Sequence, residues 1–183
     1  MYNRSSAFDP RVARSQQQLR DALLALTLEH GWDAVSVRQI CQRAGVGRST
    51  FYAHFADRED LLLGAFQGEH IAPRPQSTHQ PLAFVHPLVE HVAQHRALYN
   101  VLAGSSCERA LRRRFLWVVS DIIESELAVR AAASVQRAAA VRFLAGAYVE
   151  TLTSWLEVRN PIPAQEIERL LREFSAPVIE RTR

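Results

Sequence analysis

Apolar residues recur at spacings of three and four along almost the whole chain, and this period constrains the fold more than any other feature. Leu19, Leu23 and Leu26 show it near the start of the chain, and Ile167 and Leu171 show it near the end. Such spacing places side chains on one face of a helix, whereas a strand would alternate them. Only 7 Gly and 8 Pro interrupt the 183 residues. We therefore predict an all-α protein.

Breaks in this period divide the chain into a series of helices. The predicted helices span residues 11–30, 36–44, 48–54, 58–67, 82–95, 96–102, 107–130, 135–159 and 163–174. Residues 68–81 contain Pro73, Pro75 and Pro81 among polar residues, a composition that excludes regular helix. We predict an N-terminal domain of three-helix, helix-turn-helix type with a linking helix, residues 1–67. A larger helical domain follows, residues 68–183.

Composition excludes several classes of protein. Hydrophobic residues make up 48% and charged residues 22%, as in soluble globular domains. No run approaches the roughly 18 uncharged residues of a membrane span, and the first ten residues lack the apolar stretch of a signal peptide. Cys41 and Cys107 lack metal-ligand spacing. We expect a cytoplasmic protein with no membrane partner, metal or cofactor. The net charge of +3 permits a polyanionic partner without demonstrating one.

The segment from Ser36 to Phe55 has the form of a helix-turn-helix. Ser36 stands three residues before Gln39, which is the spacing of a capping box at a helix start. Gly45 supplies the tight turn after a helix of about two turns. A second short helix follows, and its Phe51 and Phe55 lie four residues apart on an inward face. This pattern is typical of proteins that place the second helix in the major groove of DNA.

Residues 37–62, VRQICQRAGVGRSTFYAHFADREDLL, closely resemble the N-terminal signature of the TetR repressor family. The likeness covers residues 19–62 at the level of motifs, and the rest of the chain agrees in length and helix pattern. The resemblance implies a homodimer that binds an inverted repeat in double-stranded DNA through residues 48–54. It also implies a small-molecule effector bound among the helices of the C-terminal domain.

Several predicted DNA contacts follow from the chemistry of the side chains. Ser36 and Arg38 stand at a helix N-terminus, where free amides and a guanidinium hold phosphate. Gly47 lets the backbone approach DNA closely, although glycine is a weaker helix cap than the Ser or Thr common in the family. Arg48 can pair with two acceptors of guanine.

The remaining predicted contacts depend on hydroxyl chemistry and on the resemblance. By likeness to the family, Tyr52 and His54 contact phosphates, and Arg58 replaces the usual Lys at the start of the fourth helix. The other two contacts are the short hydroxyls of Ser49 and Thr50. Ahead of the motif, Arg4, Arg11 and Arg14 could form a basic arm or remain solvated.

The C-terminal domain is rich in aromatic residues, for which core packing is the simplest account. The resemblance nevertheless implies a cavity among these helices, with a few polar anchors in an apolar wall. The predicted ligand-binding residues are Phe84, His91, Tyr99, Trp117, Phe143 and Tyr148.

Other notable residues have simpler explanations. Trp32, like Phe51 and Phe55, fits core packing, and Cys41 packs on a buried face. Cys107 near a helix start is expected to be more accessible to solvent. His91 and His95 have the i, i+4 spacing of a metal pair but no visible third ligand. The run Arg112 to Arg114 fits a solvated helix face.

The leading hypothesis is a transcription repressor that a small molecule releases from its operator. The alternative is a regulator of the same fold that a partner protein controls, or that acts as an activator. An enzyme is not expected, because the sequence has no nucleophile elbow, no phosphate-binding glycine loop and no paired metal motif. The last two long helices are predicted to form the dimer interface, with Leu144 and Leu170 in it. The helix that begins at Arg58 is predicted to act as the lever between the domains.

Overall fold

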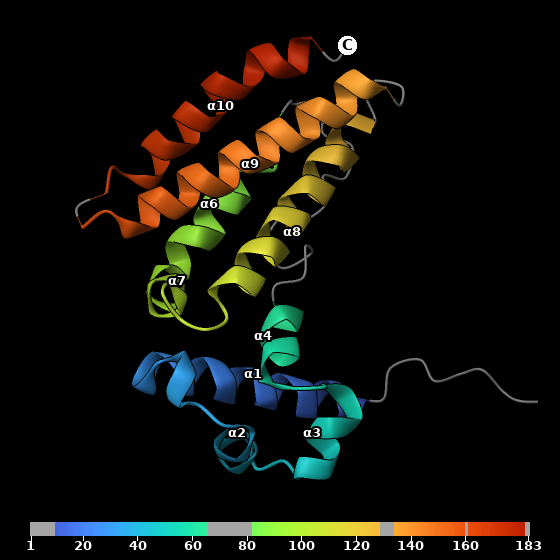
Figure 1. The fold of residues 1–183 in the computed structure, drawn as a ribbon, viewed down its shortest axis with the longest axis vertical. Coiled ribbons are helices and arrows are strands. Elements are labelled where there is room, and N and C mark those ends of the chain that lie inside the picture. The colour runs from blue at the N-terminus through green and yellow to red at the C-terminus, as the bar shows by residue number, and fades with distance from the viewer. Residues whose placement is uncertain (1–9, 66–81, 129–133, 160, 182–183) are drawn as a thin grey trace, which may run out of the picture.

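The computed structural model describes residues 10–65, 82–128, 134–159 and 161–181. Within these ranges the chain forms helices and no strand, so the all-α prediction is confirmed. The N-terminal unit contains α1 (Pro10–His30), the 3-10 turn η1 (Trp32–Ala34), α2 (Val37–Ala44), α3 (Arg48–His54) and α4 (Arg58–Ala65). The C-terminal unit contains α6 (Val85–Gln94), α7 (Arg96–Leu102), α8 (Glu108–Ala128), α9 (Val135–Glu157) and α10 (Ala164–Glu180). Figure 1 shows the first unit below the second.

Two helix limits differ from the sequence-based expectation by three residues or more. The helix expected at Leu82 begins at Val85, because Leu82 adopts φ 62°, a left-handed conformation, and donates its N–H to the Glu126 carboxylate. The last helix, expected to end near Phe174, continues to Glu180 through Pro177. Proline removes one backbone hydrogen bond from this extension of the helix, and the burial of Ile179 offsets the stability that is lost with it. The predicted linker, residues 68–81, and the predicted domain boundary at residue 67 lie outside the described residues.

The N-terminal unit is built around the buried face of α1. Leu19 and Leu23 on this face are fully buried, and Phe51 of α3 packs into the same core. The Arg43 guanidinium donates to both carboxylate oxygens of Glu29, which ties α2 to α1. Such a two-pronged pair fixes orientation as well as distance. The core and this pair together hold α2 and α3 at the end of the molecule farthest from α10 (Figure 1).

In the C-terminal unit, α8 and α9 pack along their length, and α6 packs against α10. The apolar stripe of α9 that was predicted to form the dimer interface lies inside this bundle. Leu144 is buried, as are Tyr148 and Leu152. The prediction that Leu144 lies in a dimer interface is therefore wrong, because the stripe is already covered by helices of its own chain. Leu170, half-buried on α10, remains partly open.

A hydrogen-bonded junction joins the two units beside the packing of α1 against α7. The indole N–H of Trp32 donates to Ser106 Oγ at 3.2 Å, and the Ser106 hydroxyl donates to the Asp33 carboxylate. Ser106 belongs to the α7–α8 loop, residues 103–107. We call Trp32, Asp33 and Ser106 the junction. It connects the turn before α2 with the loop before α8.

A salt bridge between α6 and α10 gives the fold a predictable pH dependence. His86 Nδ1 lies 2.8 Å from Glu168 Oε2, and this hydrogen bond raises the pKa of His86 above its ordinary 6.5. Burial raises the pKa of Glu168, but hydrogen bonds from His86 and Arg172 outweigh it and lower the pKa below 4.5. The stabilisation that His86 gives the fold is complete below the pKa of histidine in the unfolded chain, and it is lost as pH rises through the raised pKa of His86 in the folded protein. The stabilisation from Glu168 is lost as pH falls through the lowered pKa of that carboxyl in the folded protein.

We predict that His86→Gln lowers the free energy of unfolding most at about pH 5.5 and least at about pH 8.5. Denaturant unfolding of both proteins at the two pH values measures this. Glu168→Gln should remove the same pH-dependent increment, whereas Glu90→Gln, whose carboxylate lies 3.7 Å from His86, should change it less. An equal loss for His86→Gln at both pH values would contradict the assignment.

Candidate nucleic-acid interface and adjoining pocket

The start of α2 is fixed by the capping box that the sequence predicts. Gln39 N–H donates to Ser36 Oγ at 3.3 Å, and Ser36 N–H donates to Gln39 Oε1 at 2.8 Å. At the other end, Gly45 adopts φ 65°, a left-handed conformation that glycine takes without steric cost. Both ends of α2 are thus defined locally, and the turn directs the chain into α3.

Helix α3 has one buried face and one exposed face. Phe51 is completely buried, which holds the helix against the N-terminal core. Arg48, Ser49 and Tyr52 are exposed, with 51% of Tyr52 accessible. The other two predicted contacts on this helix, Thr50 and His54, are half-buried.

Gly47 begins α3 with extended backbone and no side-chain cap, as the sequence predicts. A Cβ at this position would meet Ser49 and Thr50 at 3.7 and 3.8 Å, which is ordinary contact. The fold itself therefore does not require glycine at position 47.

Charge is unevenly distributed over this surface. Arg43 is committed to Glu29, but Arg38 at the start of α2 and Arg48 at the start of α3 have no ion pair within the described part of the chain. Ser36 and Arg38 are exposed beside the α2 N-terminus. The surface therefore presents two unneutralised guanidiniums and several hydroxyls, a combination suited to phosphate and base edges.

Arg58, also predicted as a DNA contact, has a structural setting. Its guanidinium lies 4.5 Å from the centre of the Trp32 ring. It donates to the carbonyl of Trp32 at 2.7 Å and to that of Val35. Arg58 thereby joins the start of α4 to the turn that precedes α2. It supports from behind the exposed surface of α2 and α3, residues 36–54, which we call the reading surface.

The predicted basic arm takes a different form in the structure. Arg11 and Arg14 are part of α1, which begins at Pro10, so they are not in an extended arm. The proline provides a favourable first residue for this helix. Arg4 lies outside the described residues.

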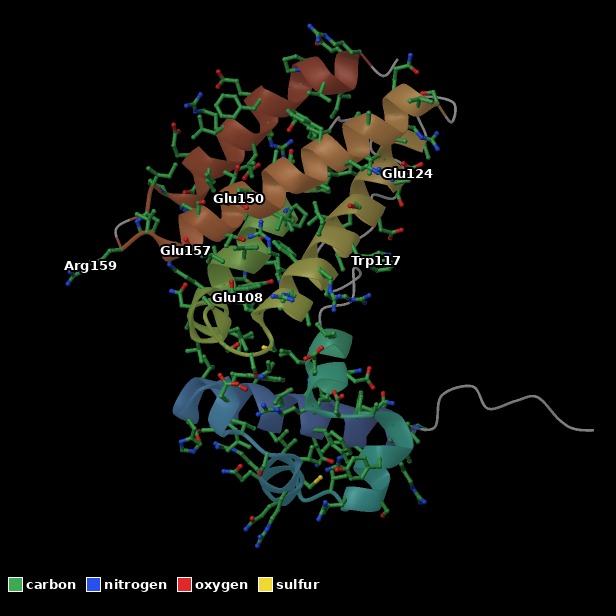
Figure 2. The ribbon with its side chains drawn as sticks, viewed as in Figure 1. Glu108, Trp117, Glu124, Glu150, Glu157 and Arg159 are labelled. Carbon is green, nitrogen blue, oxygen red and sulfur yellow. The ribbon has the colours of Figure 1, made fainter. Side chains whose placement is uncertain are left out.

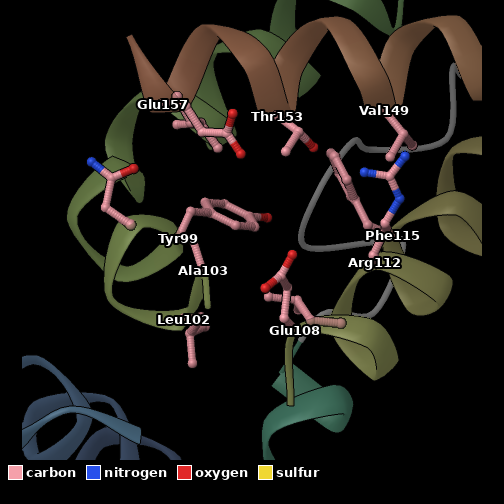
Figure 3. A pocket seen from close by; sticks show the side chains of 12 residues that line it. Tyr99, Leu102, Ala103, Glu108, Arg112, Phe115, Val149, Thr153 and Glu157 are labelled. Atoms are coloured by element: carbon pink, nitrogen blue, oxygen red, sulfur yellow. The ribbon is translucent and has the colours of Figure 1, made fainter. Parts of the chain in front are cut away.

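A pocket lies between α7, α8 and α9, close to the junction (Figure 3). Tyr99 is the one predicted ligand residue that lines it. The other lining residues were not among the predicted ligand contacts, because apart from Phe115 they are polar or aliphatic and they come from three helices and the loop after α7. They are Asn100, Leu102, Ala103, Glu108, Leu111, Arg112, Phe115, Val149, Thr153, Leu156 and Glu157. Arg112, expected on a solvated face, pairs with Glu150 at the pocket edge.

The other predicted ligand residues lie elsewhere. Phe84 and Tyr148 are buried with ring centres 5.5 Å apart, and burial raises the pKa of Tyr148 to about 12. His91 stacks on His95, and its ring centre lies 6.4 Å from that of Tyr99, behind the pocket wall. No cluster of three or more metal-ligating side chains forms among the described residues.

Trp117 and Phe143 are 56% and 64% exposed, and the structure does not bring them to the pocket. Figure 2 shows Trp117 on the outer side of α8.

The expectation that Cys107 is accessible is wrong. Cys107 is 1% exposed, with its sulfur 3.3 Å from Ser105 Oγ. Burial raises the pKa of its thiol, and the Glu59 and Asp33 carboxylates add to the rise. Cys41 is also buried, as expected, with a raised pKa of the same cause. Both thiols are therefore protonated and unreactive at neutral pH.

Comparison with known families assigns both units. Residues 19–65 match the family of bacterial regulatory proteins of the tetR type, and residues 80–176 match a transcriptional regulator C-terminal region. A comparison with curated proteins found no match.

Several solved structures share the fold. One is a putative TetR-family regulator from Syntrophomonas wolfei, with a TM-score of 0.68 at 22% identity over 92% of this chain and 96% of that one. Another is the dihydroxyacetone kinase operon activator DhaS, with a TM-score of 0.67 and 16% sequence identity over 92% of this chain and 96% of that one. A third is NalD, the secondary repressor of a multidrug efflux pump in Pseudomonas aeruginosa, with a TM-score of 0.59 and 22% sequence identity over 93% of this chain and 98% of that one.

The helix-turn-helix surface and the helical bundle behind it define a DNA-binding transcriptional regulator. The chain belongs to the TetR family, as the sequence resemblance indicates. Proteins of this family are regulators and not enzymes. Within the described residues, no helix is both long and apolar enough to span a bilayer.

The setting of Arg58 leads to a stability prediction. Arg58→Ala leaves the carbonyls of Trp32 and Val35 without their charged donor, so it should lower the free energy of unfolding by about 1–3 kcal/mol. Arg58→Lys should recover only part of this loss, because an ammonium cannot combine the flat stack on Trp32 with both hydrogen bonds. Denaturant unfolding measures both variants. Arg38→Ala is the matched control on the exposed surface, and a loss equal to that of Arg58→Ala would contradict the structural role.

Proposed function

We propose that this regulator is a homodimeric repressor that binds an inverted-repeat operator and leaves it when a small molecule occupies the pocket. The observation that carries the proposal is the juxtaposition of three features along one path. These are an exposed, unneutralised reading surface on α2 and α3, the junction behind it, and the pocket whose wall continues into the α7–α8 loop.

At the DNA, α3 enters the major groove while α2 crosses the backbone. Arg48 pairs with guanine acceptors, and the hydroxyls of Ser49 and Thr50 reach neighbouring base edges. Tyr52 and His54 bind phosphates, as do Ser36 and Arg38 at the start of α2. Gly47 allows the backbone to approach the duplex closely. Arg58 acts mainly by holding this surface in place, and any phosphate contact it makes is additional.

The dimer forms through the outer faces of α9 and α10. Phe143 on α9 and Phe174 on α10 are 64% and 68% exposed, and these two large side chains supply apolar area for the proposed interface to bury. Gly146 lies on α9 with open space where a Cβ would be, and Ala147 next to it is exposed, so another helix can approach closely. Two reading heads on a symmetric dimer fit half-sites about 34–36 Å apart or a little more.

Release uses the junction as the connection between pocket and reading head. Leu102, Ala103 and Glu108 line the pocket and flank Ser106 in sequence. Glu108 Oε2 accepts the Gly104 N–H at 2.7 Å, so a ligand that displaces this carboxylate also disturbs the loop. Ser106 then carries the change to Asp33 and Trp32, immediately before α2. The junction replaces the helix from Arg58 as the principal lever, because its direct hydrogen bonds join the two units.

Control by a partner protein, or activation of transcription, is the alternative within the same fold. The pocket favours a small molecule, and run-off transcription on a promoter that carries the operator distinguishes repression from activation.

We predict that Arg48→Ala changes base preference while Tyr52→Phe weakens binding to all sequences alike. A guanine-specific pair contributes about 1–3 kcal/mol at one base pair, whereas a phosphate contact carries no sequence information. Selection of duplexes from a random pool, followed by titration of point-substituted sites, measures both effects. A selected sequence without two inverted half-sites would contradict the dimeric reading mode. A base-selective loss with Tyr52→Phe and a uniform loss with Arg48→Ala would reverse the roles.

A second prediction concerns the dimer. Phe174→Arg and Phe143→Arg each place a charge in the proposed apolar interface and should shift the molecular mass in sedimentation analysis from dimer to monomer. Trp117→Arg is the matched control, because Trp117 is also more than half exposed but lies on α8 (Figure 2). Dimers that persist in both Phe variants would place the interface elsewhere.

A further inference from the structure

The pocket carries an excess of negative charge. Its lining includes the carboxylates of Glu108 and Glu157 and the guanidinium of Arg112. Arg112 donates to Glu150 across the pocket edge, so its charge is already balanced by a carboxylate outside the lining. Within the described residues Glu157 has no hydrogen bond or ion pair, and Glu108 uses one oxygen on the Gly104 N–H. Two carboxylates thus face the pocket, and neither has an ion pair within the described part of the chain.

Two arginines near the C-terminal end of α9 do not fill this role. Arg96 donates to the carbonyls of Trp155, Leu156 and Val158 and so closes the C-terminal end of α9. Figure 2 shows Arg159 directed outward beyond that end of the helix.

Two aromatic rings line the pocket together with the carboxylates. Tyr99 and Phe115 lie with ring centres 6.0 Å apart and planes inclined by 46°. Figure 3 shows the carboxylates of Glu108 and Glu157 on either side of the Tyr99 ring, and both are directed toward the same space. Aromatic faces attract cations and repel anions, because the face of the ring is the negative part of its quadrupole. The rings and carboxylates therefore favour the same sign of ligand charge.

The size of the pocket limits the ligand group that enters it. The cavity has a volume of about 70 Å³. At about 10–15 Å³ for each water, this is room for roughly five to seven groups of the size of a water molecule. A trimethylammonium group or a similarly compact protonated amine fits this space, whereas a complete drug-sized molecule would have to leave most of its atoms at the mouth.

We propose that the pocket binds a compact organic cation of the quaternary or protonated amine class, held between Glu108 and Glu157 above the rings of Tyr99 and Phe115. The proposal rests on the proposed function and names the chemical class of its effector. Glu108 is the carboxylate that also holds Gly104. A cation that attracts it therefore competes with the hydrogen bond that orders the α7–α8 loop.

The decisive probe pair is choline and 3,3-dimethyl-1-butanol, which have the same shape and differ in the positive charge. Isothermal titration calorimetry on the full-length protein without DNA should give binding of choline at least about tenfold tighter than that of the neutral alcohol. Added salt should weaken choline binding and leave the alcohol unaffected. Equal affinity for the two probes, or binding of neither, would overturn the proposal. Tighter binding of an anionic probe such as butyrate would assign the pocket to Arg112 instead.

Variants separate a specific site from general attraction to an acidic surface. Glu157→Gln and Glu108→Gln should each weaken choline binding by about tenfold, and Arg112→Gln should strengthen it. Glu124→Gln is the matched control, because Glu124 lies on α8 far from the pocket and pairs with Arg137 (Figure 2). A Glu124→Gln loss as large as that of Glu157→Gln would contradict a localised site. Glu157 is exposed, so its substitution leaves the core intact.

Operator titrations distinguish failure of this inference from failure of the proposed function. If choline binding depends on Glu157 but leaves operator affinity unchanged, the cation site is supported and the proposal that the ligand releases the operator is wrong. If a neutral or anionic compound releases the operator and choline does not bind, ligand-controlled release is supported and the cation site is wrong.

Discussion

The surroundings of Trp32 hold the structure together at the point where its two units meet. Its indole is buried, and a buried indole N–H requires an acceptor, which Ser106 of the α7–α8 loop provides. Arg58 stacks on the ring and donates to the carbonyls of Trp32 and Val35, so the start of α4 and the entry into α2 are fixed to one side chain. The position of the reading surface and the attachment of the C-terminal unit thus depend on the same residue.

The helix-turn-helix could be predicted because its determinants are local. The capping pair Ser36 and Gln39, the left-handed Gly45 and the spacing of Phe51 all act within one or two turns of helix. Their outcome does not depend on distant parts of the chain. The same reasoning explains why the missing side-chain cap at Gly47 was evident from the sequence alone.

The pocket and the proposed dimer surface could not be predicted in the same way. Glu108 and Glu157 stand 49 positions apart and resemble ordinary surface charges until α8 and α9 place them around Tyr99. The stripe that includes Leu144 correctly indicates burial, but periodicity does not reveal which helix covers a buried face. Arg58 shows a related limit, since its partner Trp32 is 26 residues away and the sequence alone suggests an exposed cation.

The central claim is that the junction couples the reading surface to the α7–α8 loop, and coupling between two sites must be reciprocal. Amide hydrogen exchange of the full-length protein, with and without a duplex selected for tight binding, tests this most directly. If the junction couples the two sites, DNA alters exchange in residues 103–107 as well as in α2 and α3. In Ser106→Ala the change at the loop should disappear while that in α2 and α3 remains. A change confined to residues 36–54 in the unaltered protein would contradict the account.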